Sequence, residues 1–357
     1  MAIETHSIDN HGDLWLIVGE QVERDEDPAC KLRVCSRTIA RASPVFHAML
    51  YGNWRESAKP NDGSDWIVNL PFDSGTSMRD LLGVIHGDSK AFATIGAQDS
   101  KDFSRMWGVL TAADKYSCLG VLGLWAPSWI NACSQHVPQE DPNWDRTKEE
   151  LNAELYPMLA AILYMLGSSD GYKKTVNLMV RRFKACHARN SSYFSPFEVY
   201  LEGLGERIHA DQLALKKVYL KTTNDIMRSL WAGNPAAPSL VPRPHLCNTP
   251  EERSRCARQC FDNLVIALQN RKLWPLPKPE SIKESPEELR WAIRKAHWGR
   301  QRCVVADAPD QWGHPKWETI EAFYVDGRSY AYKLTPEEKK ALEKNKSIID
   351  AGCVYTK

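Results

Sequence analysis

The stretch CKLRVCSRTIARASPVFHAML, residues 30–50, decides the fold of the first part of this chain. Polar and apolar residues alternate up to Cys35, which is the period-two pattern of a half-buried strand. From Ser36 the pattern becomes helical, and Ser43-Pro44 ends one short helix and opens another, since Ser caps helix N-termini and Pro is tolerated at the first helical position. A strand that leads into two helices without a glycine-rich loop predicts a scaffold junction and not a phosphate-binding loop.

Two more strands are predicted around this stretch. The run 14–18 is apolar throughout between Asp13 and Gly19, which predicts a strand buried on both faces. It should pair as a hairpin with the strand that begins residues 30–50. After the two short helices, a connection rich in Gly, Asn, Ser and Pro leads to a short apolar strand at 66–71.

Helices are predicted after the strands, because apolar residues recur there with helical spacing. The stripes are Met78, Leu81, Leu82 and Ile85 in a first helix, Phe103, Met106, Trp107, Leu110 and Ala113 in a second, and Val121, Trp125 and Trp129 in a third. Strands first and helices after them predict an α+β domain.

Five segments of the chain stand in the order and spacing of the BTB/POZ family. They are GDLWLIVG (12–19), LRVCSRTIARASPVFHAML (32–50), WIVNLP (66–71), VIHGDS (84–89) and AADKYSCLGVLGLWAPSWI (112–130). On these segments the first third of the chain resembles that family, most closely its members from filamentous fungi. The resemblance implies a BTB/POZ domain over residues 8–134, a small sheet covered by helices, and a role in protein–protein interaction.

The rest of the chain is predicted to be mainly α-helical. Residues 135–233 carry helical stripes and are interpreted as an extension of the first domain. Four prolines make residues 234–248 the clearest linker. Residues 249–357 form a helical C-terminal region with one β-hairpin at 323–332, where an Asp-Gly turn separates two apolar runs.

The pattern Ser/Thr-Pro-Glu-Glu occurs three times, starting at Thr249, Ser285 and Thr335. Each copy places a capping side chain, a proline at the first helical position and two acids at the positive end of a helix. We interpret each as the start of a helix. Proline-directed phosphorylation is the alternative interpretation.

Composition indicates a soluble intracellular protein. The 357 residues suggest roughly two or three domains, and 46 basic against 45 acidic residues give no overall charge that would favour nucleic acid or an acidic membrane. Ten irregularly spaced cysteines without a signal peptide favour a reducing compartment. Apolar runs stay short of the ~20 residues that span a bilayer. We expect a cytoplasmic or nuclear location, or both.

No metal, cofactor or catalytic site is predicted. His245, Cys247, Cys256 and Cys260 are the best zinc candidates, but the two later cysteines continue an apolar helical stripe and are interpreted as buried. Nucleophile, phosphate-binding and dinucleotide motifs are absent from the sequence. His86 is interpreted as a packed or surface imidazole and not as a general base.

The last third of the chain is rich in tryptophan, which is enriched at interface anchors. Core packing is the default for most of these residues. They are Trp274, Trp291, Trp298, Trp312 and Trp317.

One pair of residues carries over from the family. Asp13 and Arg37 match the acidic and basic residues of a charged pocket near the dimer centre of transcriptional BTB domains. Since an isolated buried charge is costly, we expect the two to pair, and we prefer a fold-stabilising ion pair to a ligand pocket. The short lead before Asp13 argues against a strand-swapped dimer, and other homo-oligomers remain open.

The sequence thus predicts a non-catalytic protein–protein interaction module. The resemblance implies an adaptor that docks a cullin-type ubiquitin ligase through the first domain and recruits a substrate through the region after the linker. Two alternatives remain: a BTB scaffold or transcription-associated factor without a ligase partner, and an enzyme with its site in the C-terminal region. On the adaptor hypothesis, residues 1–134 fold alone, and removal of residues 245–357 leaves scaffold binding intact.

Overall fold

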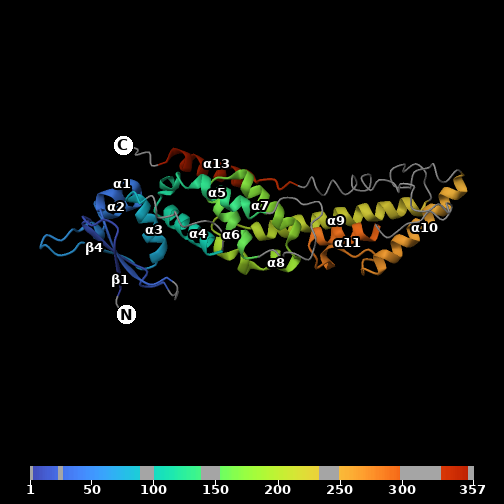
Figure 1. Cartoon of the computed structure of the whole chain (residues 1–357), viewed down its shortest axis with the longest axis horizontal. Coiled ribbons are helices and arrows are strands. Elements are labelled where there is room, and N and C mark those ends of the chain that lie inside the picture. Colours follow the sequence, from blue (N-terminus) through green and yellow to red (C-terminus); the bar gives the residue numbers. More distant parts are fainter. Residues whose placement is uncertain are drawn as a thin grey trace. The chain divides into compact units, whose positions relative to one another are not determined.

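The computed structural model describes residues 3–22, 27–88, 100–137, 153–232, 249–297 and 331–352. These residues form two compact units. Unit 1 contains the described residues of 1–141, 154–175 and 334–357, and unit 2 contains those of 142–153 and 176–333. The fold is mixed α+β, as predicted, with many helices and a four-stranded sheet in unit 1 (Figure 1).

The sheet has the strand order β1-β3-β2-β4. Its strands are β1 (Glu4–Ser7), β2 (Leu14–Val18), β3 (Cys30–Val34) and β4 (Ile67–Leu70). The predicted hairpin of β2 with β3 is confirmed, because these strands are antiparallel neighbours. Strand β4 runs parallel to β2, and β1, which the sequence pattern did not predict, runs parallel to β3.

Only one face of β2 is fully buried. Leu14, Leu16 and Val18 point into the core, whereas Trp15 and Ile17 are half-buried on the other face. The prediction that residues 14–18 are buried on both faces is therefore wrong. On the outer face two cations from β3 lie over the indole ring of Trp15, Lys31 Nζ at 4.4 Å from the centroid and Arg33 Cζ at 5.6 Å. Such stacking shields the ring from water without a covering helix.

Ser43 separates α1 (Ser36–Ala42) from α2 (Pro44–Tyr51), as predicted. Its buried hydroxyl accepts a hydrogen bond from the Phe46 backbone N–H at 3.0 Å and donates one to the Tyr116 carbonyl at 2.6 Å. The Phe46 ring also stacks on the Tyr116 ring, with centroids 4.2 Å apart. One cap thereby fixes the helix pair and ties it to the end of α4, about seventy residues later.

Two of the three predicted amphipathic helices are confirmed. The further helices of unit 1 are α3 (Gly75–Ile85), α4 (Ser100–Lys115), α5 (Ala126–Gln135) and α6 (Leu155–Met165). Helices α3 and α4 bury their predicted stripes except for Ile85 and Trp107, which are half-buried. The third stripe is divided between a 3₁₀ turn, η2 (Leu119–Leu122), and α5, because Pro127 near the start of α5 favours a new helix there.

Helix α13 (Pro336–Ala351) belongs to unit 1 although it ends the described chain. The Tyr172 hydroxyl donates a 2.6 Å hydrogen bond to Glu338 Oε1, and the Asn345 side chain donates one of 3.0 Å to the Tyr164 carbonyl. Leu342 is fully buried in this packing. The predicted boundaries at 134 and 249 thus differ from those of the compact units, because unit 1 also takes up α6 and α13.

Three glycines allow the backbone of α13 to come close, and a Cβ atom on one of them, Gly123, would lie 2.7 Å from the Ile349 carbonyl oxygen. A Cβ atom on Gly120 would lie 2.5 Å from the Gly352 carbonyl oxygen, and one on Gly167 would lie 2.3 Å from the Lys346 nitrogen. Gly167 also has a φ of +69°, which other residues adopt only at a cost. A side chain at any of these positions would push α13 away.

Unit 2 is helical in its described part. Helix α7 (Ser169–Arg182) begins in unit 1 and ends in unit 2, which also holds α8 (Ala185–Arg189), α9 (Leu204–Trp231), α10 (Pro250–Gln269) and α11 (Pro286–His297). The predicted linker at 234–248 lies outside the described residues, and so does the predicted hairpin at 323–332 except for its last two residues.

The capping interpretation is confirmed at two of its three sites. Thr335 and Glu338 form a capping box at the start of α13. At α11, Ser285 Oγ accepts from the Glu288 N–H at 3.2 Å, and Glu288 Oε2 accepts from the Ser285 N–H at 2.8 Å. Helix α10 begins at Pro250, as predicted.

Replacing Leu342 by Ala is expected to destabilise unit 1 by about 2–5 kcal/mol, because it removes a fully buried side chain from the packing of α13. Chemical denaturation of the full chain measures this loss. Lys344→Ala, an exposed position on the same helix, is the control and should stay within ~0.5 kcal/mol of wild type. Equal stability of Leu342→Ala and wild type would show that α13 is not part of the core.

Candidate functional site

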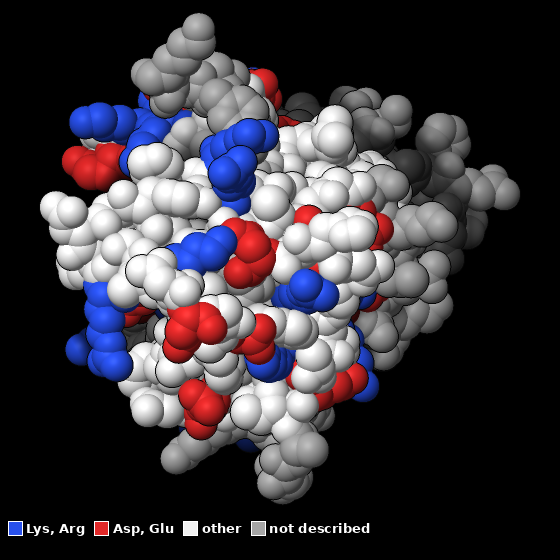
Figure 2. Space-filling view, turned by 90° about the vertical axis from the view of Figure 1, so that its left-hand side faces the viewer, with Lys and Arg blue, Asp and Glu red and all other residues white. Residues whose placement is uncertain are grey.

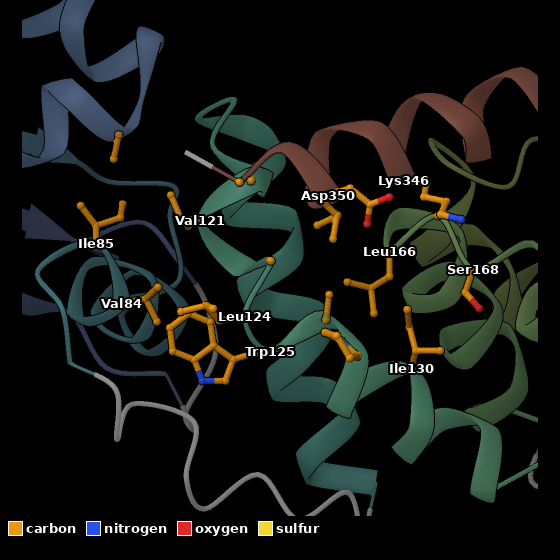
Figure 3. Close-up of a pocket in the computed structure, with 18 of the residues that line it drawn as sticks. Val84, Ile85, Val121, Leu124, Trp125, Ile130, Leu166, Ser168, Lys346 and Asp350 are labelled. Carbon is orange, nitrogen blue, oxygen red and sulfur yellow. The ribbon is translucent and has the colours of Figure 1, made fainter. Parts of the chain in front are cut away.

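Unit 1 contains a groove with a volume of about 1030 Å³. We call it the α5 groove, since residues between Gly120 and Ile130, at the start of α5 and just before it, line it. Its walls come from the end of α3, the turn between α6 and α7, and the last turns of α13. Figure 3 shows the side chains of Val84, Leu124 and Trp125 on one side of the groove and those of Leu166 and Asp350 on the other.

Apolar side chains dominate the labelled lining, and one of them is unusually exposed. Leu124 lies in the short connection between η2 and α5. Its side chain is 87% exposed, although both of these elements contain buried residues. The turn around Gly123 leaves Leu124 outside the core, while Leu122 and Ala126 are buried. Unlike a singly exposed apolar residue, Leu124 lies beside other apolar side chains of the groove, and a contiguous exposed apolar patch is typical of an interaction surface.

The rim of the α5 groove carries charges of both signs. Arg41 and Lys346 contribute positive charges, and Asp170 and Asp350 contribute negative ones. Asp170 is held by Lys174 at 2.7 Å, one helical turn away. The balance favours a partner with mixed charges around an apolar stripe over a polyanion such as nucleic acid.

A second cavity of unit 1 has a volume of about 580 Å³ and a polar lining. Two charged residues of this lining, Arg105 and Asp80, form an ion pair. Arg105 donates two hydrogen bonds to the buried carboxylate of Asp80, at 2.5 Å to Oδ2 and 2.9 Å to Oδ1. This fork joins α3 to α4. We therefore assign it a structural role and take the α5 groove as the candidate site.

The predicted pairing of Asp13 with Arg37 is not formed. The Asp13 carboxylate accepts hydrogen bonds from the Ser36 N–H at 2.8 Å and the Ser36 hydroxyl at 2.9 Å, and Lys59 Nζ lies 3.3 Å from Oδ2. Partial burial raises the pKa of Asp13, but these hydrogen bonds outweigh it and keep the pKa below its ordinary value. Arg37 is exposed. Asp13 therefore caps α1 across the β2–β3 hairpin, and a solvated Arg37 needs no partner.

His86 is held by backbone groups on both sides of its ring. Nε2 accepts a hydrogen bond from the Cys35 N–H at 3.0 Å, and Nδ1 lies 2.8 Å from the Leu82 carbonyl oxygen. Since Nε2 accepts, the ring is neutral with its proton on Nδ1. Burial lowers the pKa of His86, and the bond to Leu82 opposes this shift only in part. The imidazole thus fastens α3 to the end of β3, in line with the interpretation as a packed residue.

In unit 2, buried polar and charged side chains lie between α9 and its neighbours. Lys216 Nζ donates to the Ile282 carbonyl at 3.0 Å, and Glu287 on α11 is paired with Arg290 and lies 3.6 Å from Arg181. Burial, with help from Glu287, raises the pKa of Tyr219 to about 12. A hydroxyl with this pKa stays protonated and is no base at neutral pH. Among the described residues, these contacts join α9 to α11 and to the segment that holds Ile282.

The zinc candidates cannot be placed together. His245 and Cys247, and the side chains of Cys256 and Cys260, lie outside the described residues. Within the described ranges, no three His, Cys, Asp or Glu side chains cluster as metal ligands would.

No described helix is long and apolar enough to cross a membrane. Of the tryptophans in the last third, Trp274 and Trp291 are described, and both are half-buried.

Comparisons of the chain with models of protein families, with curated proteins and with solved structures gave no match.

The sequence pattern did not predict the α5 groove, because Leu124 is not part of the predicted helical stripe. A signal was present: residues 119–125 hold more large apolar side chains than one helical face can bury.

Asp13→Ala is expected to destabilise unit 1 by ~1–3 kcal/mol, because it leaves the Ser36 N–H at the start of α1 without its acceptor. Arg37→Glu should change the free energy of unfolding by less than ~0.5 kcal/mol, since Arg37 is exposed. Denaturant titrations of the two full-length variants make the comparison. A large loss on charge reversal at Arg37 would restore the predicted ion pair.

The pH dependence of stability should report on His86. A pKa lowered by folding means that the unfolded state binds the proton more readily. The contribution of neutral His86 is present above the unfolded pKa of about 6.5 and is lost as pH falls through the lower folded pKa. Between pH 7.5 and 5, the free energy of unfolding should fall more in wild type than in His86→Gln. Parallel curves for the two proteins would contradict this role.

Proposed function

We propose that this protein is a non-catalytic protein–protein interaction module of the BTB/POZ type that serves as a substrate adaptor for a cullin-type ubiquitin ligase. The element order of unit 1 supports the family assignment. The hairpin β2–β3, the helix pair α1–α2, strand β4 and helices α3 to α5 follow one another in the order of the five resembling segments.

The observation that carries the proposal is the exposure of Leu124 at the mouth of the apolar α5 groove. Covering one leucine side chain is worth about 1.5–3 kcal/mol, which corresponds to roughly a tenfold to hundredfold change in affinity. An exposed side chain of this kind is stabilising only when a partner covers it. The groove beside it provides the shape for an apolar stripe of that partner.

The charge distribution also supports a protein partner. On the face of the molecule that carries β4, acidic and basic side chains are interspersed among uncharged ones (Figure 2). The described residues on this face form no broad area of a single sign. Nucleic-acid binding would favour a continuous basic surface.

The proposal still assigns scaffold binding and substrate recruitment to different parts of the chain. It changes which residues are needed for scaffold binding. Lys346, Ile349 and Asp350 of α13 line the α5 groove, so removal of residues 245–357 would take away one of its walls. We therefore expect this deletion to impair scaffold binding, in contrast to the expectation from the sequence. Residues 1–134 alone lack the same wall and the packing of α6. Point variants of the full chain are the better test.

Leu124→Asp is expected to weaken binding of the full chain to a purified cullin N-terminal domain at least tenfold, because it places a charge where an apolar contact is proposed. Val199→Asp is the matched control, since Val199 is 90% exposed and lies outside the groove. Its affinity should equal that of wild type. Calorimetric titration measures all three proteins.

Affinity purification of the tagged full chain from its source cells, followed by mass spectrometry, distinguishes the alternatives. Cullin peptides that are recovered with wild type and Val199→Asp, and lost with Leu124→Asp, support the adaptor. Chromatin proteins in place of cullin would favour a transcription-associated scaffold. Cullin binding that is indifferent to Leu124→Asp would show that the α5 groove is not the docking site.

A further inference from the structure

Helices α11 and α13 both begin with the Ser/Thr-Pro-Glu-Glu pattern and form the same cap. Their capping residues differ in solvent exposure. Ser285 at α11 is 1% exposed. Thr335 at α13 is half-buried, and Lys333, Pro336 and Glu337 around it are exposed. Two copies of one motif therefore serve as test and control within a single chain.

The backbone at Thr335 suits recognition by an enzyme. Residues 331–335 form neither helix nor strand, and Thr335 has φ −67° and ψ 160°, an extended conformation directly before Pro336. Tyr332 is buried and its N–H donates a 2.6 Å hydrogen bond to Asn177 Oδ1, whereas Lys333 is exposed and Leu334 and Thr335 are half-buried. A proline-directed kinase binds its substrate in an extended conformation around the Ser/Thr-Pro bond, which Thr335 already has. Among the described residues, the hydroxyl oxygen accepts one hydrogen bond, from the Glu338 N–H to Thr335 Oγ1 at 3.1 Å.

We propose that Thr335 is a phosphorylation site and that its modification loosens α13, a wall of the α5 groove. In the reaction, Thr335 Oγ1 attacks the γ-phosphorus of magnesium-bound ATP, and the bond from that phosphorus to the bridging oxygen breaks. ADP leaves with the electron pair, and the hydroxyl proton passes to the base of the kinase. The control of partner binding, but not the modification itself, rests on the function proposed for the groove.

Glu338 is the reason why a phosphate would loosen the helix. Its Oε2 accepts a hydrogen bond from the Thr335 N–H at 2.8 Å, and its Oε1 accepts the one from the Tyr172 hydroxyl at 2.6 Å. Glu338 and Tyr172 are both buried. A phosphate adds about −1.5 to −2 charges next to this carboxylate, and like charges in a poorly solvated place repel strongly. The carboxylate can move away only by leaving Tyr172.

A phosphate at a helix start also has a favourable side, because helix N-termini attract anions. At α13 that positive end is already used by Glu337 and Glu338 in the first turn. The buried repulsion therefore outweighs the gain. Once the first turn leaves Tyr172, the groove residues Lys346 and Asp350 on the same helix lose their fixed position.

The experiment incubates the full-length protein with a proline-directed kinase and MgATP and maps phosphate by mass spectrometry. We expect phosphate on Thr335 and none on Ser285. Hydrogen–deuterium exchange of residues 336–351 should then be at least tenfold faster than in the unmodified chain. Thr335→Asn, which keeps a capping side chain but cannot be phosphorylated, should show no kinase-dependent change in this helix.

A second variant tests the role of Glu338. In Glu338→Gln the hydrogen-bond acceptor remains but the charge is gone, so phosphorylation of Thr335 should accelerate exchange much less. Absence of phosphate on Thr335, or phosphate there with unchanged or slower exchange of α13, would overturn the proposal. Faster exchange with undiminished cullin binding would leave the modification in place and refute the proposed role of the groove.

Discussion

The close approach of α13 to Gly120 and Gly167 is the contact on which the rest of unit 1 depends. It brings the end of the described chain onto a turn near residue 120 and another near residue 167. Without it, Leu342 and Ile349 would be exposed and the α5 groove would lose a wall. The candidate site is thus built by segments that are far apart in the sequence.

Buried polar groups fix the geometry of this assembly. Asp73, after β4, accepts hydrogen bonds from Lys115 at 2.7 Å and from the Tyr116 hydroxyl at 2.9 Å. Ser43 and Glu338 act in the same way at the starts of α2 and α13. Each of these side chains links two segments of the chain through hydrogen bonds to backbone groups, to side chains or to both, and a satisfied buried network specifies one arrangement over many apolar ones.

Local structure could be predicted from the sequence wherever one segment carries its own signal. The alternation before Cys35, the Ser43-Pro44 boundary and the cap at Thr335 each depend on neighbouring residues, and the structure contains all three. Strand β1 was missed because four polar residues give no periodic pattern. The place of α13 could not be predicted, since Tyr172 and Glu338 are 166 positions apart.

The predicted site failed for a different physical reason. Asp13 was assigned to Arg37 on the premise that both charges are buried, but the Asp13 side chain is 39% exposed and Ser36 offers two nearer donors. At such a position a carboxylate gains more from two hydrogen bonds at a helix start than from an exposed cation. Leu124 was missed because helical periodicity highlights the side chains that are buried, and a binding surface consists of those that are not.

Native-state hydrogen exchange of the unmodified full chain, measured at increasing denaturant, tests the central claim that α13 is an integral part of unit 1 most directly. We predict that the protected amides of α13 open with the same free energy and denaturant dependence as those of α4. Exchange of α13 through a low-energy opening of its own, while α4 stays protected, would contradict it.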